Sequence, residues 1–211
     1  IAYVVGNKSF GKYDFQVSND VLIPRPDTEI IIEQVIKLTK NKSKYNVLDI
    51  GVGSGCIILS ILKEKKNFRG TGIDISKKTL RICKINSDNL GVSNRLKLFK
   101  SDVDNFQIGK YDLIVSNPPY IKNTDLKYLD KNVIGFEPRI ALDGGLEGVS
   151  VIQKVIEKSS KLIKKNGTLV LEIAFDQKER VIKNLKSKGF YIKKIVKDFA
   201  NKDRCITAIK I

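Results

Sequence analysis

The sequence predicts an α/β protein built on a mostly parallel sheet of seven strands, with helices on both faces. From Val47 onward, short apolar runs alternate with longer amphipathic stretches, and this alternation indicates strands joined by crossover helices. The first of these strands leads into a glycine-rich turn, Gly51-Val52-Gly53-Ser54-Gly55. Two late strands follow each other without a helix between them, which predicts an antiparallel hairpin at one edge of the sheet.

Residues 1–24 predict a small β-hairpin that precedes this sheet. Tyr3-Val4-Val5 and the segment Tyr13 to Val17 are strand-like, and a Gly-Asn turn signal lies between them. Pro26 then opens a helix, a position where the missing N–H of proline is tolerated. Residues 25–211 are expected to form the larger domain.

The remaining elements follow from local composition and turn residues. Strands are expected at 46–50, 70–74, 96–100, 111–116, 167–173, 189–197 and 204–210, and helices at 55–65, 77–90, 149–164 and 176–187. Ser76 is a suitable N-cap for the second of these helices, and Gly91 is suited to end it. Segment 121–148 is polar and glycine-rich, and such a long ordered loop within a compact domain is usually functional.

Composition excludes several classes of protein. At 211 residues the chain can bury a full core as one domain, and its 42% hydrophobic content is that of a globular protein. No apolar run reaches the roughly 18–20 residues that span a bilayer, so we expect no membrane association. The absence of histidine excludes histidine-based acid–base chemistry and histidine-ligated metals.

The start of the chain and its cysteines lead to two further expectations. There is no methionine and the chain begins at Ile1 in mid-pattern, so we expect residues upstream of it. The three cysteines fit no metal spacing and are odd in number, which predicts no metal site and a reducing, cytoplasmic compartment. Cys56 is expected near a helix start, where a thiol can be acidified, although a small core residue is the simpler interpretation.

The net charge of +16 leaves two interpretations open. A basic balance favours polyanionic partners such as nucleic acid or the ribosome. Most of the excess is lysine spread along the chain, without an arginine cluster or a basic stripe with interleaved aromatics. Coding bias would produce the same pattern, so proximity to the ribosome or RNA is only a weak expectation.

The glycine-rich turn and the strand after it predict an adenosine-containing cofactor. Asp74 ends the second strand 23 residues after Gly51, close to the spacing at which an acidic residue meets ribose hydroxyls. The G-x-G-x-G spacing differs from the G-x-G-x-x-G of dinucleotide sites. S-adenosylmethionine has no phosphate to place at the helix N-terminus, so this spacing favours it over NAD. Asp102, after the third strand, is a further acceptor at the same edge of the sheet.

The four residues Asn117-Pro118-Pro119-Tyr120 are the most informative motif. They follow the apolar run Leu113 to Val115, and two prolines must end that strand because neither has an N–H to donate. The Asn117 side-chain oxygen and the Pro118 carbonyl can then accept both hydrogens of an incoming –NH2 group, while Tyr120 walls off the same place. The motif therefore predicts a site that acts on a neutral planar nitrogen.

At this point the chain resembles the class I S-adenosylmethionine-dependent methyltransferases. More narrowly, it is similar to the protein-(glutamine-N5) methyltransferases of the PrmC/HemK type, which methylate peptide chain release factors. The resemblance covers essentially the whole chain. The matching stretches are Val21 to Glu29, Asp49 to Cys56, Ser116 to Ile121, Phe136 to Arg139, Ala141 to Gly145 and Asp203-Arg204. Two departures are Val52, where Thr is common, and Ala174, where Gly is usual.

The resemblance implies a Rossmann-like catalytic domain at 25–211 and a hairpin at 1–24 that links it to a helical domain upstream. It implies methyl transfer from S-adenosylmethionine to the glutamine of a Gly-Gly-Gln motif in a release factor. The implied cofactor residues are Gly51, Val52, Gly53, Ser54, Gly55, Asp74, Asp102, Val103 and Asn117. The implied substrate residues are Phe15, Arg25, Asn117, Pro118, Pro119 and Tyr120, of which Asn117, Pro118 and Tyr120 are catalytic.

Two alternatives remain from the residues themselves. An N6-adenine methyltransferase acting on RNA or DNA would use the same amine clamp, but it would need a flipped base and a target-recognition region larger than segment 121–148. A non-catalytic module for an adenosine cofactor, or an NAD-binding domain, would leave the motif at 117–120 unexplained.

Overall fold

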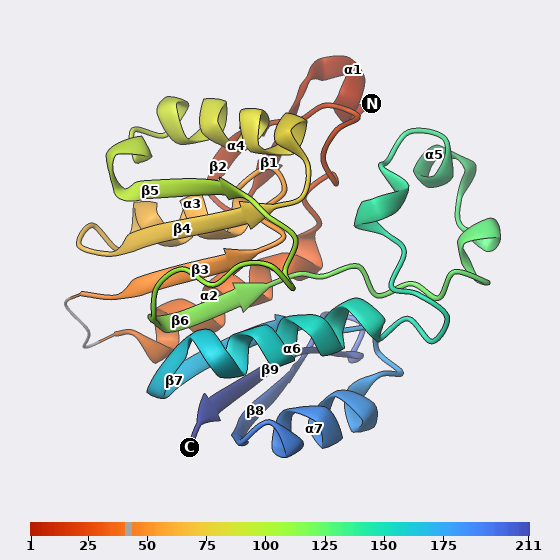
Figure 1. The fold of residues 1–211 in the computed structure, drawn as a ribbon. Coiled ribbons are helices and arrows are strands. Elements are labelled where there is room, and N and C mark those ends of the chain that lie inside the picture. The colour runs from red at the N-terminus through yellow and green to blue at the C-terminus, as the bar shows by residue number, and fades with distance from the viewer. Residues whose placement is uncertain (41–43) are drawn as a thin grey trace.

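A computed structural model describes residues 1–40 and 44–211 and shows two sheets (Figure 1). The larger sheet has the strand order β5-β4-β3-β6-β7-β9-β8. Its strands are β3 (Asn46–Ile50), β4 (Arg69–Asp74), β5 (Leu96–Lys100), β6 (Tyr111–Ser116), β7 (Ile163–Glu172), β8 (Phe190–Lys197) and β9 (Asp203–Lys210). Strands β3 to β7 pair in parallel, whereas β9 runs antiparallel between β7 and β8. The predicted fold, including its antiparallel edge, is confirmed.

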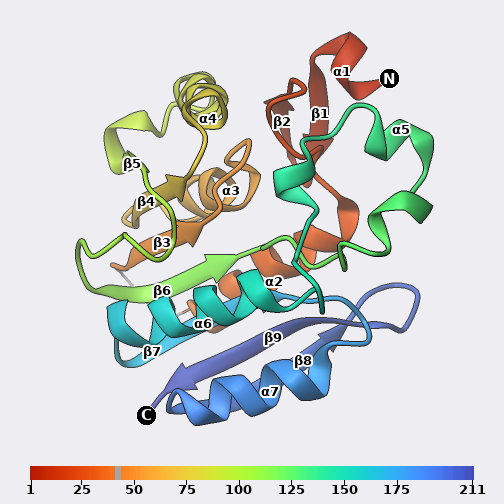
Figure 2. The same ribbon diagram turned by 45° about the vertical axis from the view of Figure 1, so that its right-hand side comes forward.

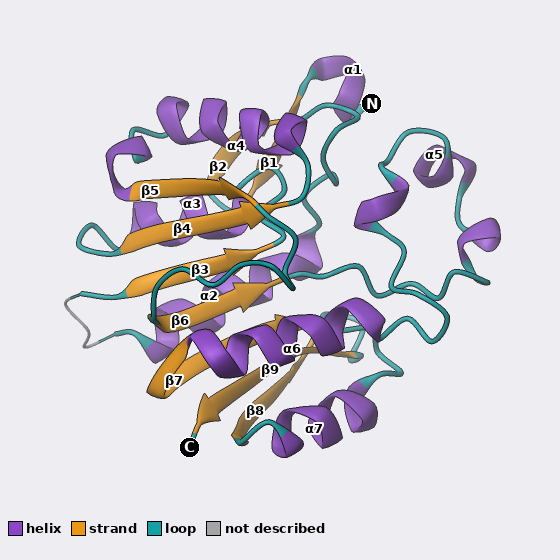
Figure 3. Cartoon of the chain, in the orientation of Figure 1, coloured by secondary structure: helices purple, strands orange, loops and turns teal. Residues whose placement is uncertain are grey.

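Helices cover both faces of the large sheet, as Figure 3 shows. The helices are α2 (Glu29–Leu38), α3 (Cys56–Glu64), α4 (Lys77–Asn89), α6 (Ser150–Leu162) and α7 (Lys178–Ser187). Short turns of 3-10 helix lie at Pro26–Thr28, Ser93–Arg95, Leu126–Tyr128 and Arg139–Ala141. As predicted, Ser76 caps α4 by accepting from the Thr79 N–H at 3.2 Å, and Gly91 follows its end with φ +66°.

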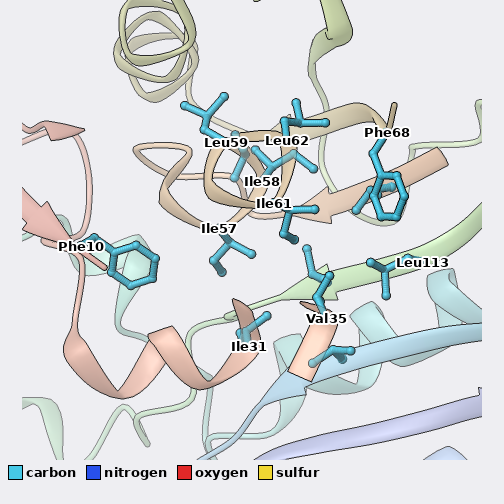
Figure 4. Packing of buried hydrophobic residues seen from close by; sticks show 14 of the residues in the cluster. Phe10, Ile31, Val35, Ile57, Ile58, Leu59, Ile61, Leu62, Phe68 and Leu113 are labelled. Carbon is cyan, nitrogen blue, oxygen red and sulfur yellow. The ribbon is translucent and has the colours of Figure 1, made fainter. Parts of the chain in front are cut away.

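The sheet separates two apolar clusters because side chains alternate along each strand. One cluster joins α2, α3 and α4 to strand residues such as Val47 and Leu113, and Figure 4 shows the part around Ile31 and Ile57. The other cluster packs α6 and α7 against strand residues such as Leu48. Each fully buried aliphatic side chain of this kind contributes about 1.5–3 kcal/mol of transfer free energy. The sheet is thus held rigidly from both sides.

The N-terminal hairpin is present, but its first strand is not where the sequence predicts it. Residues Ala2–Val5 form the short helix α1, which ends at Gly6 with φ +75°. The hairpin pairs β1 (Asn7–Phe10) with β2 (Tyr13–Gln16). The β-branched Val4 and Val5 favour a strand locally, but they find no pairing partner and stay exposed, so their propensity is overridden.

The start of β7 also differs from the prediction. The sequence places residues up to 164 in the preceding helix and begins the strand at 167, whereas α6 ends at Leu162 and β7 begins at Ile163. Asn166 adopts φ +61°, and the pairing of β6 with β7 is irregular between Tyr111 and Leu113. The polar Lys164 and Lys165 carry no strand periodicity, so the sequence gives no sign of this extension.

One buried amide links the hairpin to the glycine-rich turn of the large domain. Asn86 of α4 accepts from the Gln16 N–H at 2.7 Å, and it donates to the carbonyls of Gln16 at 3.0 Å and Ser54 at 2.8 Å. Ser54 belongs to the glycine-rich turn. A single side chain therefore ties the hairpin to the turn that is expected to hold the cofactor.

We expect Asn86→Ala to lower the free energy of unfolding by about 2–4 kcal/mol, because three backbone groups lose a buried partner. Urea unfolding of the wild type and the variant measures the difference. Asn89→Ala is the matched control, since Asn89 is exposed on the same helix and its loss should change the free energy by less than about 0.5 kcal/mol. Equal effects of the two substitutions would contradict the anchoring role of Asn86.

Segment 121–148 is a folded excursion from the sheet that contains the short helix α5 (Lys131–Ile134). Its two ends are joined by hydrogen bonds from the Ile121 N–H to the Leu142 carbonyl and from the Gly144 N–H to the Ile121 carbonyl. In Figure 2 this excursion lies beside the N-terminal hairpin, beyond the carboxyl end of β6. Among the described residues, no helix has the length and apolar character that a membrane span needs, and no cluster of three or more His, Cys, Asp or Glu side chains is arranged to hold a metal ion.

Candidate active site

A cavity of about 470 Å³ opens where the carboxyl ends of β3, β4 and β6 meet the excursion. The chain runs from β3 outward to β4 and β5 and then returns to place β6 on the other side of β3. In open α/β sheets, this reversal of strand order leaves a crevice that binds ligands. Its volume lies within the range of about 300–1,000 Å³ that is usual for small-molecule sites.

Most of the predicted site residues line this cavity. They are Arg25, Gly51, Val52, Gly53, Ser54, Asp74, Asp102, Val103, Asn117, Pro118 and Pro119. They come from the ends of four strands and from the turn before α2, so the sheet brings together residues that are up to 94 positions apart, from Arg25 to Pro119. Proximity alone does not assign their roles, which depend on the contacts described below.

The glycine-rich turn can lie close to a ligand because its three glycines adopt left-handed backbone. Gly51 has φ +78°, Gly53 has φ +55° and Gly55 has φ +86°. A Cβ at Gly51 would meet no atom within 4 Å, so the turn presents bare backbone there. Gly55 is different and does not line the cavity: a Cβ there would lie 2.7 Å from Cys83 Sγ and from Leu59. Gly55 therefore serves the close packing of α3 against α4, and its contact with the cofactor stays a prediction.

Asp74 holds the glycine-rich turn in place. Its Oδ2 accepts from the Gly53 N–H at 3.2 Å and its Oδ1 from the Ser76 N–H at 3.0 Å. Burial raises the pKa of this carboxyl, while the hydrogen bonds from Ser76 and Gly53 lower it. Each carboxylate oxygen keeps a second lone pair, so Asp74 can accept from ligand hydroxyls while it orders the turn.

The charges of the cavity suit a ligand that carries hydroxyl or cationic groups. Its acidic side chains include Asp20, Asp74, Asp102 and Asp143. The two basic side chains in the wall are both engaged: Arg25 forms an ion pair with Glu137, and Lys154 Nζ lies 2.5 Å from Asp104 Oδ2. A phosphate group would find no unpaired cation in this wall. The residues present therefore fit S-adenosylmethionine, with its ribose hydroxyls, ammonium and sulfonium.

Asn117 and Pro118 place two acceptors at the cavity. The Asn117 Nδ2 group donates to Thr28 Oγ1 at 2.9 Å, which leaves Oδ1 as the free end of the amide. Within the part of the chain that the structure describes, no donor contacts this Oδ1 or the Pro118 carbonyl. The two oxygens come from adjacent residues in a stiff turn, so together they can receive both hydrogens of one –NH2 group.

Two predicted substrate residues lie elsewhere. Phe15 is fully buried against Phe10, with ring centroids 6.1 Å apart, and packs into the core beside α2 and α3. Tyr120 does not line the cavity, because its ring packs against the core on the α6 side and its hydroxyl donates to Glu172 Oε1 at 3.3 Å. In both cases an apolar ring gains more from burial than from exposure at the cavity mouth. Neither Phe15 nor Tyr120 lines this cavity, and their contacts with substrate stay predictions.

Arg25 lines the cavity but is also paired with Glu137, whose side chain is almost fully buried. The pair connects the turn before α2 to the excursion across the cavity mouth. The excursion is thus fixed over the site by a charge interaction between residues 112 positions apart.

The cavity also contains residues that the sequence did not indicate. Ser150, Val151 and Lys154 come from the first turns of α6. Which face of a helix meets a cavity is decided by packing, so no local signal could have found them. Thr28 and Asp143 differ in that they lie inside stretches that carry the family resemblance.

Cys56 lines the cavity but is not acidified by its place in the first turn of α3. Burial raises the pKa of its thiol to about 12, and the negative charges of Asp49 and Glu172 act in the same direction. The desolvation of the thiolate outweighs the favourable helix N-terminus. Cys56 is therefore a small, unreactive wall residue.

Glu172, beneath the cavity, is a buried carboxyl with a perturbed pKa. Burial raises this pKa from its ordinary 4.5 to about 7, against the opposing effects of a hydrogen bond from Thr28 and the charge of Arg204. Its Oε2 has no hydrogen-bond partner among the described residues. Ionisation of Glu172 therefore costs free energy in the folded protein.

This shift makes stability depend on pH. Between the two pKa values the folded state binds more protons than the unfolded state, so the free energy of unfolding falls as pH rises from about 4.5 to about 7. Glu172→Gln cannot titrate, so we expect its stability relative to the wild type to increase by about 3 kcal/mol between pH 4.5 and pH 8.5. Urea unfolding across this range measures the difference, with the exposed Glu33→Gln as control. A difference that does not change with pH would contradict the shift.

Comparison with known proteins gives consistent matches. A family model described as "Methyltransferase small domain" matches residues 27–136. The chain is 35% identical over 211 residues to a release factor glutamine methyltransferase of Caulobacter vibrioides, covering all of this chain and 73% of that protein. It is 37% identical over 213 residues to the protein of the same name from Clostridium acetobutylicum, covering all of this chain and 75% of that one.

Solved structures agree on the fold. A ribosomal protein L11 methylase from Lactobacillus delbrueckii superposes with a TM-score of 0.67 at 17% identity, covering 90% of this chain and 82% of that one. A methyltransferase from Pyrococcus furiosus superposes with the same TM-score and identity, covering 93% of this chain and 88% of that one. At this identity the superpositions bear on architecture alone.

Proposed function

Because this chain belongs to the family of release factor glutamine methyltransferases, we propose that it transfers a methyl group from S-adenosylmethionine to the side-chain amide nitrogen, N5, of a glutamine in a peptide chain release factor. The target would be the glutamine of a Gly-Gly-Gln motif. The single observation that carries the proposal is the pair of unpaired acceptors, Asn117 Oδ1 and the Pro118 carbonyl, beside the glycine-rich turn.

The proposed cofactor site uses the residues that fit it. Gly51 and Gly53 would let the cofactor approach the backbone, Asp74 would accept from the ribose hydroxyls, and Asp102 with Val103 would flank the adenine. S-adenosylmethionine, when bound, supplies an electrophilic methyl group on a sulfonium. The apolar part of the wall, including Ile50 and Val52, would exclude water from that group.

Asn117 and Pro118 would prepare the nitrogen for attack. An amide nitrogen is a poor nucleophile because its lone pair is delocalised into the carbonyl. With both N–H groups donated to fixed oxygens, the nitrogen is held in one place and a pyramidal geometry is favoured. Such alignment can contribute several kcal/mol to a reaction barrier without a charged base. The displaced proton would pass to water after transfer.

The proposed substrate is a protein of translation, so we place the reaction in the cytoplasm.

Incubation of the chain with methyl-labelled S-adenosylmethionine and a purified release factor tests the proposal. The matched control is the same factor with the glutamine of its Gly-Gly-Gln motif replaced by alanine. We expect label on the intact factor and none on the control. Label on both factors, or on adenine-containing RNA or DNA and not on the factor, would overturn the proposal and favour adenine methylation in the second case.

A further inference from the structure

The orientation of the Asn117 amide is set by a residue outside the motif that contains it. The Asn117 Nδ2 group donates to Thr28 Oγ1 at 2.9 Å. Thr28 is 2% exposed and belongs to the turn Pro26–Thr28 at the start of α2. An asparagine amide has an acceptor end and a donor end of nearly the same shape. Whichever end faces Thr28, the other end faces the cavity.

In the structure the donor end of the amide faces Thr28. The contact joins Asn117 Nδ2 to Thr28 Oγ1, and no donor contacts Asn117 Oδ1 within the described part of the chain. A hydroxyl oxygen can accept this hydrogen bond, so Thr28 holds the NH2 end of the amide away from the cavity.

We propose that Thr28 is a positioning residue that holds the Asn117 amide with its oxygen toward the substrate, so that the acceptor pair with the Pro118 carbonyl is formed before the target binds. This inference rests on the proposed function, because it assigns the residue that orients its clamp. A reversed amide would present NH2 to an incoming NH2 group and would repel it. The contact joins two segments, the turn before α2 and the end of β6.

Thr28→Val tests the proposal, because valine keeps the shape of threonine and removes the hydroxyl. At saturating cofactor and release factor we expect kcat to fall about 10-fold, the effect of one buried hydrogen bond on the orientation of the amide, with the Kd for S-adenosylmethionine within about 2-fold of the wild type. Thr28→Ser restores the hydroxyl and should return kcat to within about 3-fold of the wild type. In an Asn117→Ala background, Thr28→Val should have no further effect, since residues that act through each other are not additive.

A readout that needs no activity separates this inference from the proposed function. In 15N-labelled protein, the side-chain NH2 signals of Asn117 are identified by their absence in Asn117→Ala. We expect slow exchange of these hydrogens with water in the wild type and in Thr28→Ser, and faster exchange in Thr28→Val. If the wild type transfers no methyl group to the factor, the proposed function fails and the exchange rates alone decide the orientation. Unchanged exchange in Thr28→Val, additive kinetic effects or failure of Thr28→Ser to restore kcat would each overturn the positioning role of Thr28.

Discussion

Asn117→Ala is expected to slow methyl transfer by about 10²–10³-fold while the Kd for S-adenosylmethionine stays within about 3-fold of the wild type. The side-chain oxygen is one of two acceptors at the cavity, and its loss leaves the target nitrogen held by the Pro118 carbonyl alone. Removal of one preorganised polar group from a reaction centre typically costs this much in kcat. Truncation leaves Thr28 without its donor but removes no contact of the glycine-rich turn, so cofactor affinity is preserved.

Single-turnover transfer from labelled cofactor to the release factor measures the rate, and calorimetric titration measures the affinity. Asn105→Ala is the matched control, because Asn105 is exposed in the loop after β5 and does not line the cavity. If Asn117→Ala retains the wild-type rate, the amide clamp is wrong and another group must position the nitrogen.

Asp74→Ala is expected to give the opposite signature, with the Kd for S-adenosylmethionine raised about 100-fold. The substitution would remove two hydrogen bonds that the ribose hydroxyls of the cofactor donate to the carboxylate. Hydrogen bonds to a charged group contribute about 1.5–3 kcal/mol each. The carboxylate also accepts from the backbone N–H groups of Gly53 and Ser76, so the turn itself loses its order. At saturating cofactor, the rate of transfer should fall less than about 10-fold, because the amide clamp is untouched.

Titration calorimetry of cofactor into wild type and variant measures this affinity. Asp88→Ala serves as control, since Asp88 is exposed on α4, forms an ion pair with Lys84 at 2.8 Å and lies outside the cavity wall. An unchanged Kd for Asp74→Ala would remove Asp74 from the cofactor site. The two variants together separate binding from transfer, which neither does alone.

The sequence by itself determined the architecture and the two motifs that line the cavity, the glycine-rich turn and the double proline. Alternating apolar runs placed all seven strands of the large sheet, because a buried parallel strand needs a continuous apolar segment between turn residues. The glycine-rich turn and the double proline mark backbone that cannot be regular, so they can be located without knowledge of distant contacts. The residues at strand ends, Asp74, Asp102 and Asn117, follow from the same topology.

Only the tertiary structure decided which neighbouring side chains serve the site. Tyr120 and Phe15 are aromatic residues that could either line a cavity or pack in a core. Packing buried Phe15 in the core and left Tyr120 partly buried against it. Thr28 is paired with Asn117 across 89 positions of the sequence. Hydrogen bonds between such distant residues depend on how the sheet and the turn before α2 pack together. That packing is a property of the whole fold, and no local pattern of residues encodes it.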